Sequence, residues 1–278
     1  MTEPTLRNRF HHILRTLVSE RPAIYLPFAR RKYPGPSPEV IGPETEFVID
    51  GYTRSASTFA VYAFQTVQST PVRMAHHLHA PAQLIAAARA GLPALVVIRD
   101  PEGALLSQVI REPGVTIRDA LFSYARFYER LQPYRSRYVV ADFEEVTSDF
   151  GAVIRRVNDR FGTSYAVFEH TDENLERCMN LMRKRPTHSA IVLGFESGTV
   201  TLDEVLRADI RPDPARREVE DAWVPSPDRK QVKSELAERW ADPRLDAARR
   251  RAYQAYHTFL QQPKTDGETA TAAAASPA

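Results

Sequence analysis

Between residues 45 and 161 the sequence alternates short apolar runs typical of β-strands with longer segments whose apolar residues recur at helical spacing. The strand-like runs are TEFVID (45–50), TPVRMAHH (70–77), ALVVIR (94–99) and RYVVADF (137–143). The helical segments are 57–67, 81–90, 101–111, 118–131 and 150–161. This alternation predicts an α/β fold of three layers (α/β/α), in which a mostly parallel central sheet has helices on both faces. Ligands of such sheets bind at the carboxyl ends of the strands, so candidate site residues are expected there.

The segments on either side of this alternation have a different character. Residues 1–44 predict an N-terminal helix followed by a proline-rich linker at 33–44. Residues 45–262 predict a single domain, with a cofactor-binding core at 45–162 and a helical lid or flank at 163–262. Helices of the flank are expected at 172–185, 202–208, 228–240 and 243–261. The tail, 263–278, is rich in small residues and is predicted to be disordered.

The N-terminal helix carries an apolar stripe beside several arginines. Phe10, Ile13, Leu14 and Leu17 recur at helical spacing within it. Two interpretations fit this pattern: a helix docked on the domain, which we favour, and a helix that lies on a membrane surface. No apolar run reaches the roughly 18 to 20 residues that a membrane span needs, so no transmembrane segment is predicted.

Charge and cysteine content narrow the partners and the compartment. The 37 Lys and Arg residues stand against 35 Asp and Glu residues, a net charge of +2, which does not indicate a nucleic-acid partner. Only five of the 37 are lysines, so anion recognition is expected to use guanidinium groups. The single cysteine, Cys178, excludes an internal disulfide and a cysteine-cluster zinc site. A cytoplasmic location is predicted from this cysteine usage.

The turn after the first strand reads DGYTRSASTF (50–59) and has the composition of an anion site. A strand-to-helix turn presents backbone N–H groups at the positive end of a helix. Ser55, Ser57 and Thr58 add hydroxyl donors, and Arg54 adds a charged, forked donor. Helix capping by Ser57 or Thr58 would explain the hydroxyls but not the arginine. The pattern GxxxxGK[ST] is missing, which argues against hydrolysis of ATP or GTP.

A second strand-to-helix junction, ALVVIRDPEGALLS (94–107), also contains a charged residue at the strand end. Asp100, Pro101 and Glu102 have the local chemistry of a helix start. That chemistry does not explain Arg99, or Ser107 eight residues further on. A surface salt bridge would account for Arg99 alone. An anion site is favoured because the loop after the first strand also has the composition of an anion site.

Together the two junctions resemble the motifs of the sulfotransferases that use 3′-phosphoadenosine 5′-phosphosulfate (PAPS). The loop of that family is written R-S-G-T-T in many members, and here residues 54–59 read RSASTF, with Ala56 in place of the usual glycine. The second motif of the family, R-[ND]-P-x-x-x-x-x-S, matches residues 99–107 without a gap. The resemblance covers about residues 45–162, and it implies a P-loop-like sulfotransferase fold with extra C-terminal helices. A weaker match places residues 143–146 in an architectural segment of the family.

The resemblance also assigns roles to individual residues. Arg54, with Ser55, Ser57 and Thr58, would hold the 5′-phosphosulfate, and Phe59 would pack on adenine. Arg99 and Ser107 would bind the 3′-phosphate. Arg229 and Lys230 are candidates for the same phosphate, although a solvated helix face explains them equally well.

Three histidines, His76, His77 and His79, lie at the end of the second strand. Sulfuryl transfer needs a base for the acceptor proton, and imidazole titrates near neutrality. The resemblance assigns that role to His77, with His79, His76 and an unassigned glutamate as alternatives. It leaves Arg54 or another arginine to neutralise the leaving phosphate. Alternation along a strand would put His76 on the face opposite His77. A metal site at His77 and His79 would need further ligands that the sequence does not identify, so no metal is predicted.

The sequence therefore predicts a metal-independent sulfotransferase. It would transfer a sulfuryl group from PAPS to a hydroxyl or amine of a small or carbohydrate-like acceptor. A non-catalytic nucleotide-binding protein on the same fold is the first alternative. A kinase-like phosphotransferase is the second, and the absence of lysine between residues 33 and 183 disfavours it.

Overall fold

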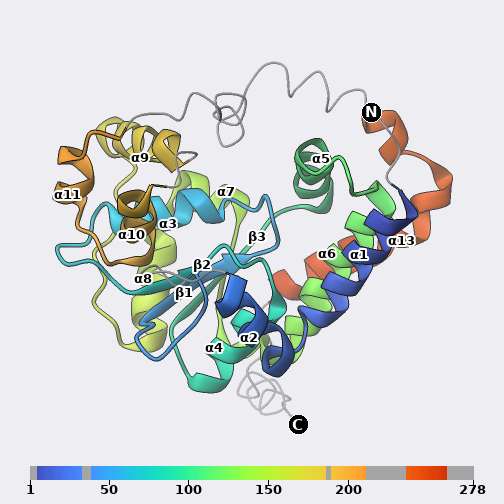
Figure 1. Cartoon of the computed structure of the whole chain (residues 1–278), viewed down its shortest axis with the longest axis horizontal. Coiled ribbons are helices and arrows are strands. Elements are labelled where there is room, and N and C mark those ends of the chain that lie inside the picture. The colour runs from blue at the N-terminus through green and yellow to red at the C-terminus, as the bar shows by residue number, and fades with distance from the viewer. Residues whose placement is uncertain (1–4, 33–38, 186–188, 211–235, 262–278) are drawn as a thin grey trace, which may run out of the picture.

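The computed structural model describes residues 5–32, 39–185, 189–210 and 236–261. Its sheet has four parallel strands in the order β2-β1-β3-β4 (Figure 1). The strands are β1 (Phe47–Gly51), β2 (Met74–His76), β3 (Ala94–Ile98) and β4 (Val139–Asp142). In the middle of the sheet, Ile49 of β1 pairs with His76 of β2 and with Leu95 of β3. The carboxyl ends of all four strands therefore lie along one edge.

Helices cover both faces of this sheet. Alternate strand residues point to opposite faces, so Val48 and Val96 belong to one apolar cluster and Ile49 and Val97 to the other. The first face packs against α4 (Pro81–Ala90), α5 (Pro101–Arg111), α6 (Ile117–Leu131) and α13 (Asp246–Leu260). The second packs against α3 (Ser57–Gln65), α7 (Phe143–Ser148), α8 (Phe150–Phe161), α9 (Asp172–Lys184), α10 (Ala190–Ser197) and α11 (Leu202–Arg207). The predicted three-layer α/β/α fold with a parallel sheet is confirmed.

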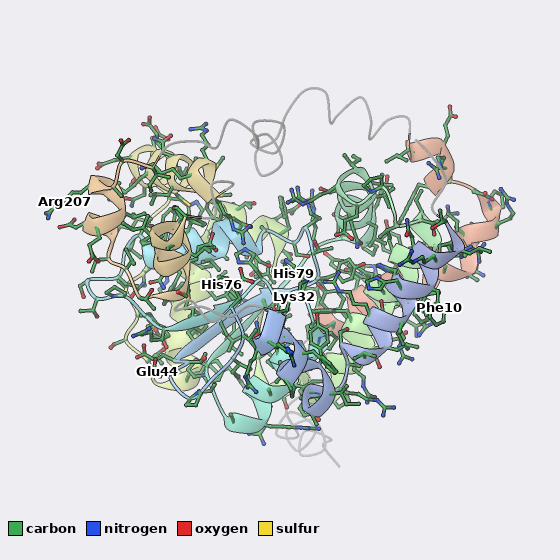
Figure 2. The ribbon with its side chains drawn as sticks, in the orientation of Figure 1. Phe10, Lys32, Glu44, His76, His79 and Arg207 are labelled. Carbon is green, nitrogen blue, oxygen red and sulfur yellow. The ribbon has the colours of Figure 1, made fainter. Side chains whose placement is uncertain are left out.

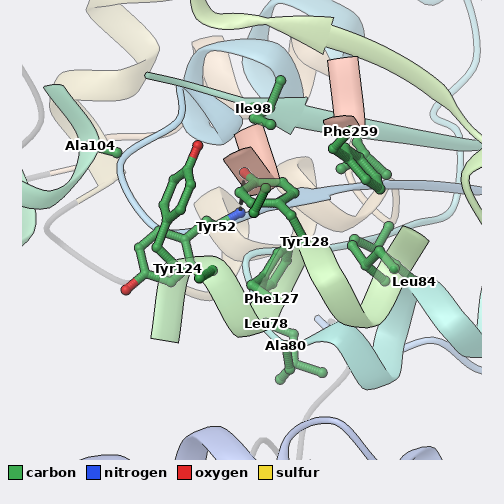
Figure 3. Packing of buried hydrophobic residues seen from close by; sticks show 14 of the residues in the cluster. Tyr52, Leu78, Ala80, Leu84, Ile98, Ala104, Tyr124, Phe127, Tyr128 and Phe259 are labelled. Atoms are coloured by element: carbon green, nitrogen blue, oxygen red, sulfur yellow. Dashed lines mark hydrogen bonds between the residues drawn. The ribbon is translucent and has the colours of Figure 1, made fainter. Parts of the chain in front are cut away.

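Aromatic side chains fill much of the first layer, between the sheet and α6. Four aromatic rings pack edge to face or at a tilt: those of Tyr52, Tyr124, Phe127 and Tyr128. The ring of Phe259, from α13, contacts Tyr128 (Figure 3). Such aromatic contacts add to the stability that burial of the rings provides. Because Tyr52 directly follows β1, this packing also fixes the start of the turn after that strand.

The exit of the chain from β1 is set by two neighbouring residues. A Cβ at Gly51 would lie 2.0 Å from the backbone oxygen of Val97, so only glycine allows β1 and β3 to approach this closely. The side chain of Asp50 is fully buried and accepts hydrogen bonds from the Gly51 backbone N–H (2.9 Å) and from the Gln83 amide (3.1 Å). The turn that follows β1 therefore starts from a fixed point.

Strand β4 ends earlier than the sequence pattern suggests. Asp142 caps α7 by accepting a hydrogen bond from the backbone N–H of Glu145 (2.8 Å), and the Glu145 carboxylate accepts one from the N–H of Asp142 (3.1 Å). This reciprocal capping box starts a helix where the apolar run alone predicts more strand. Likewise, only Met74–His76 of the run at 70–77 forms a strand.

Two helices precede the sheet: α1 (Leu6–Val18) and α2 (Pro22–Lys32). The sequence pattern predicts the first but not the second, which begins on a proline suited to the first helical position. Helix α1 lies on α6 as expected of a docked helix, but the contacts that hold it are polar. The Arg9 guanidinium pairs with Asp119 (3.0 Å), and His12 Nε2 lies 3.1 Å from the Ser123 hydroxyl.

Some sequence expectations concern residues outside the described part. These are residues 33–38 of the predicted linker, the helix expected at 228–240 up to residue 235, with Arg229 and Lys230, and the tail at 263–278. Residues 236–240 are helical. Among the described helices, none combines the length and the apolar character that crossing a membrane requires.

Candidate functional site

The arginines that follow β1 and β3 meet at the carboxyl edge of the sheet. Arg99 Nη1 donates a hydrogen bond to the backbone oxygen of Arg54 (3.2 Å), and Arg54 Nε donates one to the Ser107 hydroxyl (2.9 Å). These residues come from two junctions that are 45 positions apart in the chain. They meet because β1 and β3 are adjacent parallel strands, whose following turns share one edge.

The turn between β1 and α3 has an unusual backbone. Arg54 and Ala56 adopt left-handed conformations, with φ of 68° and 72°. Ala56 stands at the N-cap of α3 and has no side-chain oxygen to accept from the first N–H groups of the helix. Those donors are therefore left for an anion, which a helix N-terminus and a left-handed turn both favour.

Side chains around this turn include buried polar atoms without a partner. Ser57 Oγ and Arg99 Nε are both buried and make no hydrogen bond. Leaving such an atom unpaired costs about 1 to 3 kcal/mol, so it is rare unless a ligand or water completes the site. Ser55 is fully buried next to Tyr128. Thr58 is also buried, with 9% of its surface exposed. The turn thus has the donors of an oxyanion site.

Arg99 is held in place from two sides. Its guanidinium lies 4.0 Å from the centre of the Phe143 ring, and its backbone oxygen accepts a hydrogen bond from the Tyr124 hydroxyl (2.6 Å). Burial lowers the pKa of Arg99, which means that its charge has lost hydration and gains from a nearby anion. By the family resemblance, Phe143 has only an architectural role. Its position directly after β4, at the same sheet edge, was the signal that could have identified it.

The histidines after β2 face the same turn. His77 Nε2 lies 3.0 Å from the Thr58 hydroxyl, and His77 Nδ1 lies 2.6 Å from His76 Nδ1. The expectation that His76 and His77 point to opposite faces is wrong. Strand β2 ends at His76, and His77 turns into a left-handed conformation (φ 55°), so the alternation of the strand does not extend to it.

Backbone strain is concentrated at this site. Among the described residues, those other than glycine with positive φ are Arg54, Ala56, His77 and His79. Each such residue costs of order 1 kcal/mol, and residues of this kind cluster at functional sites. All four lie in the loops that follow β1 and β2.

A buried carboxylate lies behind the histidines. Glu196 Oε1 accepts hydrogen bonds from the Tyr62 hydroxyl (2.7 Å) and from Arg185 Nε (2.7 Å), all of them within the protein interior. Glu196 Oε2 and His76 Nε2 are buried without a hydrogen-bond partner. Sequence reasoning missed Glu196 because α10, which carries it, lies 120 residues beyond β2 and has no strong periodic pattern of its own.

By distance, this cluster could hold a metal ion. Ligand atoms of His76, His77 and Glu196 lie within 4.8 Å of one another. Arg185, however, already neutralises Glu196, so a divalent ion would bring two uncompensated charges into a buried setting, which is costly. The cluster is better described as two neutral histidines beside a buried Glu196–Arg185 ion pair.

A polar hollow opens beside the turn, between α1 and the strand ends. Tyr52, Thr53 and His79 line it from the strand side, and His12 and Thr16 line it from α1. The Tyr52 hydroxyl is fixed there by Gln108 and Ser123, each 2.7 Å away. The hollow is a candidate for the space in which a second substrate binds.

One predicted site residue has a different environment. Phe59 is 8% exposed, and its ring packs against Phe150, Phe168 and His170 in the second core layer. Its contact with adenine stays a prediction. The other predicted residues, namely Arg54, Ser55, Ser57, Thr58, His77, Arg99 and Ser107, lie in or beside the turns at the sheet edge.

The site makes the stability of the fold sensitive to acid. Burial lowers the pKa of His76 to about 4 and that of His77 well below its ordinary value of 6.5. Below pH 6.5 the unfolded chain therefore binds more protons than the folded one. The contribution of His76 is fully present above that pH and is lost as the pH falls toward 4, at up to about 1.4 kcal/mol per pH unit, and His77 acts in the same direction.

Urea unfolding between about pH 7 and pH 5 should measure this effect. We expect the free energy of unfolding to fall more steeply for the wild type than for His76→Gln. His257→Gln, at an exposed histidine, is the control and should keep the wild-type slope. Equal slopes for the wild type and His76→Gln would contradict a neutral, buried His76.

Ala56 gives a second prediction about stability. A left-handed conformation costs a residue with a Cβ roughly 1 to 2 kcal/mol, and glycine avoids most of that cost. Ala56→Gly should therefore raise the free energy of unfolding by about 1 kcal/mol in thermal or urea unfolding. Ala86→Gly, within the right-handed helix α4, should lower it by a similar amount. A loss of stability in both variants would mean that Ala56 is not strained.

Comparison with known proteins adds a distant similarity. No family model matches the sequence, and no curated protein matches it. Among solved structures, the chain is similar to the crystal structure of mouse sulfotransferase SULT7A1 complexed with PAP. The sequence identity is 11% and the TM-score is 0.35, with 70% of this chain and 90% of that chain covered. A similarity this distant carries no conclusion about activity, which must come from the residues of the site.

Proposed function

We propose that this protein is a sulfotransferase that transfers a sulfuryl group from PAPS to a hydroxyl or amine of a small or carbohydrate-like acceptor. The observation that carries the proposal is the convergence of Arg54, Arg99 and Ser107 at adjacent strand ends. Beside them, Ser57 Oγ and Arg99 Nε are buried donors that make no hydrogen bond, and Arg99 Nε has the Asp100 carboxylate at 3.9 Å. Such donors suit a ligand with two separate anionic groups on one nucleoside.

The donor set fits both ends of PAPS. In the proposal, Arg54, Ser55, Ser57 and Thr58 bind the phosphosulfate together with the free N–H groups of α3. Arg99 and Ser107 bind the 3′-phosphate. Arg54 and Ser107 are hydrogen-bonded to each other (2.9 Å), so binding would replace this contact with bonds to phosphate oxygens. Phe59, which is 8% exposed, is the proposed contact of adenine.

Bound PAPS would supply an activated sulfuryl group and a bisphosphate leaving group. The task left to the protein is to take a proton from the acceptor and to neutralise the leaving phosphate. Arg54 carries the charge for the second task. His77 Nε2, now 3.0 Å from the Thr58 hydroxyl, is the proposed base, and its lowered pKa keeps it in the neutral form that can accept a proton.

The residues behind His77 favour one tautomer. Two Nδ1 atoms 2.6 Å apart share one proton, so one imidazole must donate to the other. With the proton of His76 on Nε2, near the Glu196 carboxylate, His76 Nδ1 accepts from His77 Nδ1. His77 Nε2 then has its lone pair toward the site, where the Thr58 hydroxyl can donate to it (3.0 Å). We propose that Glu196, whose charge is balanced by Arg185, acts on the pair through His76 by favouring this tautomer.

A cytoplasmic location belongs to the same proposal. It is supported by the single cysteine, Cys178, which is buried and cannot form an internal disulfide. The acceptor is proposed to enter the polar hollow lined by Tyr52, Thr53 and His79. His79 and His76 are the alternatives to His77 as base.

Binding of the nucleotide tests the role of Arg99. Arg99→Ala should weaken the binding of 3′,5′-bisphosphoadenosine by about 1.5 to 3 kcal/mol, because a charged hydrogen bond is lost, while AMP binding barely changes. Titration calorimetry measures both. Arg207→Ala, which removes an arginine with an 82% exposed side chain, is the control and should alter neither affinity.

Two results would argue against this assignment. Equal losses for the bisphosphate and AMP would refute a specific role of Arg99 at the 3′-phosphate. Tighter binding of ATP with Mg²⁺ than of the bisphosphate would favour the phosphotransferase alternative.

Turnover tests His77. We choose His77→Asn because asparagine tolerates the left-handed backbone at this position but is not a base. Transfer of labelled sulfate from PAPS to a panel of phenols, sugars and amines should fall about 100-fold or more, with bisphosphate affinity retained.

Unchanged turnover in His77→Asn would move the base elsewhere, with His79 as the next candidate. If the wild type bound the bisphosphate but labelled no member of the panel, the chain would be a non-catalytic nucleotide-binding protein.

A further inference from the structure

Helix α1 presents its apolar side to solvent. Leu6, Phe10 and Leu14 are four residues apart and share one face, and their exposed fractions are 82%, 68% and 47%. Figure 2 labels Phe10 at the outer edge of the molecule. An amphipathic helix of a globular protein normally buries this face, but no residue of α1 is buried. The contacts to α6 instead use Arg9 and His12 on the polar side.

Helix α2 and the junction between the two helices extend this surface. Ile24 and Phe28 of α2 are 43% and 68% exposed. Arg31 and Lys32, which are also exposed, fall on the same side of α2 by helical spacing. At the junction, Leu17 and Ile24 border one hollow, whose other lining residues are Val18, Glu20, Arg21, Arg126 and Arg130. The apolar stripe is therefore continuous from α1 to α2.

The charge of this surface is strongly positive. Residues 5–32 contain seven arginine and lysine residues and one acidic residue, Glu20; Arg9 faces α6 and pairs with Asp119, which leaves six basic residues for this surface. Glu20 is buried and pairs with Arg126 (2.6 Å) and Arg130 (3.7 Å), so it does not offset the exposed cations. An exposed apolar stripe beside clustered cations is the pattern of a helix that lies in the headgroup region of a bilayer.

We propose that the surface formed by α1 and α2 binds an anionic lipid bilayer. Leucine and phenylalanine side chains enter the headgroup region, and the arginines and Lys32 contact lipid phosphates. A second copy of the chain fits less well, because the same cationic surface would face itself. A continuous apolar stripe exposed on a folded protein marks an interaction site. The positive charge beside it favours an anionic lipid surface.

The test is flotation of the full chain with vesicles. One vesicle is pure phosphatidylcholine, and the other contains about 30% phosphatidylglycerol, which provides the negative surface. We expect binding to the anionic vesicle only, and we expect high salt to weaken it. The variant Phe10→Ser, Leu14→Ser, Phe28→Ser should lose more than about tenfold in partitioning, since it removes three exposed apolar side chains. Because these residues are exposed, the fold should be unaffected, and thermal unfolding checks this.

Two matched variants separate the contributions. Leu206→Ser changes an exposed leucine on α11, remote from this surface in sequence, and should bind as the wild type does. Arg31→Glu combined with Lys32→Glu should weaken binding to anionic vesicles while leaving the apolar stripe intact.

Three outcomes would overturn the proposal. These are the absence of binding to either vesicle, equal binding by the triple serine variant, and a dimer in light scattering that the triple serine variant abolishes. The last outcome would assign the surface to a second copy of the chain. None of these results bears on PAPS, so the test is independent of the proposed sulfotransferase activity.

Discussion

The carboxylate of Asp50 ties together the two loops that form the candidate site. It is fully buried at the end of β1 and accepts hydrogen bonds from its own turn at Gly51 and from the backbone N–H of His79 in the loop after β2 (3.2 Å). His79 Nδ1 in turn donates to the backbone oxygen of Gly51 (2.9 Å). A buried carboxylate is tolerated only with several such donors, so these bonds must form together. The arrangement of Arg54 relative to His77 depends on this link.

The same link explains how four left-handed residues persist in one place. Backbone strain survives where the surrounding structure determines the conformation more strongly than the residue resists it. On one side of the sheet edge, the close approach of Gly51 to Val97 fixes the start of the turn that contains Arg54 and Ala56. On the other, Asp50 fixes the loop that contains His77 and His79. These contacts therefore hold the loop of Arg54 and Ala56 and the loop of His77 and His79 in fixed positions relative to each other.

Much of this site could be predicted from the sequence because its parts are local. The pairs Arg54 with Ser57 and Arg99 with Ser107 each belong to one strand-to-helix junction, and a parallel sheet brings such junctions to one edge. The direction of the His76 side chain relative to that of His77 could not be predicted. The backbone of His77 is left-handed, so the alternation of side chains along the strand stops at His76. Glu196 could not be predicted either, since its contact with the histidines depends on how distant helices pack. Helix α2 could not be predicted for a different reason: it has Pro27 in its interior, and its apolar residues do not form one stripe, since Leu26 and Ala29 are buried whereas Ile24 and Phe28 are exposed.

Helix α1 shows that the side of a helix that docks on its neighbour need not be its apolar side. The pattern of Phe10, Leu14 and Leu17 predicts where the apolar side of the helix is, but it does not say what that side faces. In the structure a charged pair, Arg9 with Asp119, decides which side meets α6, because the Asp119 side chain, only 4% exposed, needs a partner. The apolar side of α1, which lies opposite this pair, therefore faces solvent. One face of α1 thus contributes His12 and Thr16 to the hollow beside the candidate site, while the opposite face stays free for a surface that accepts apolar side chains.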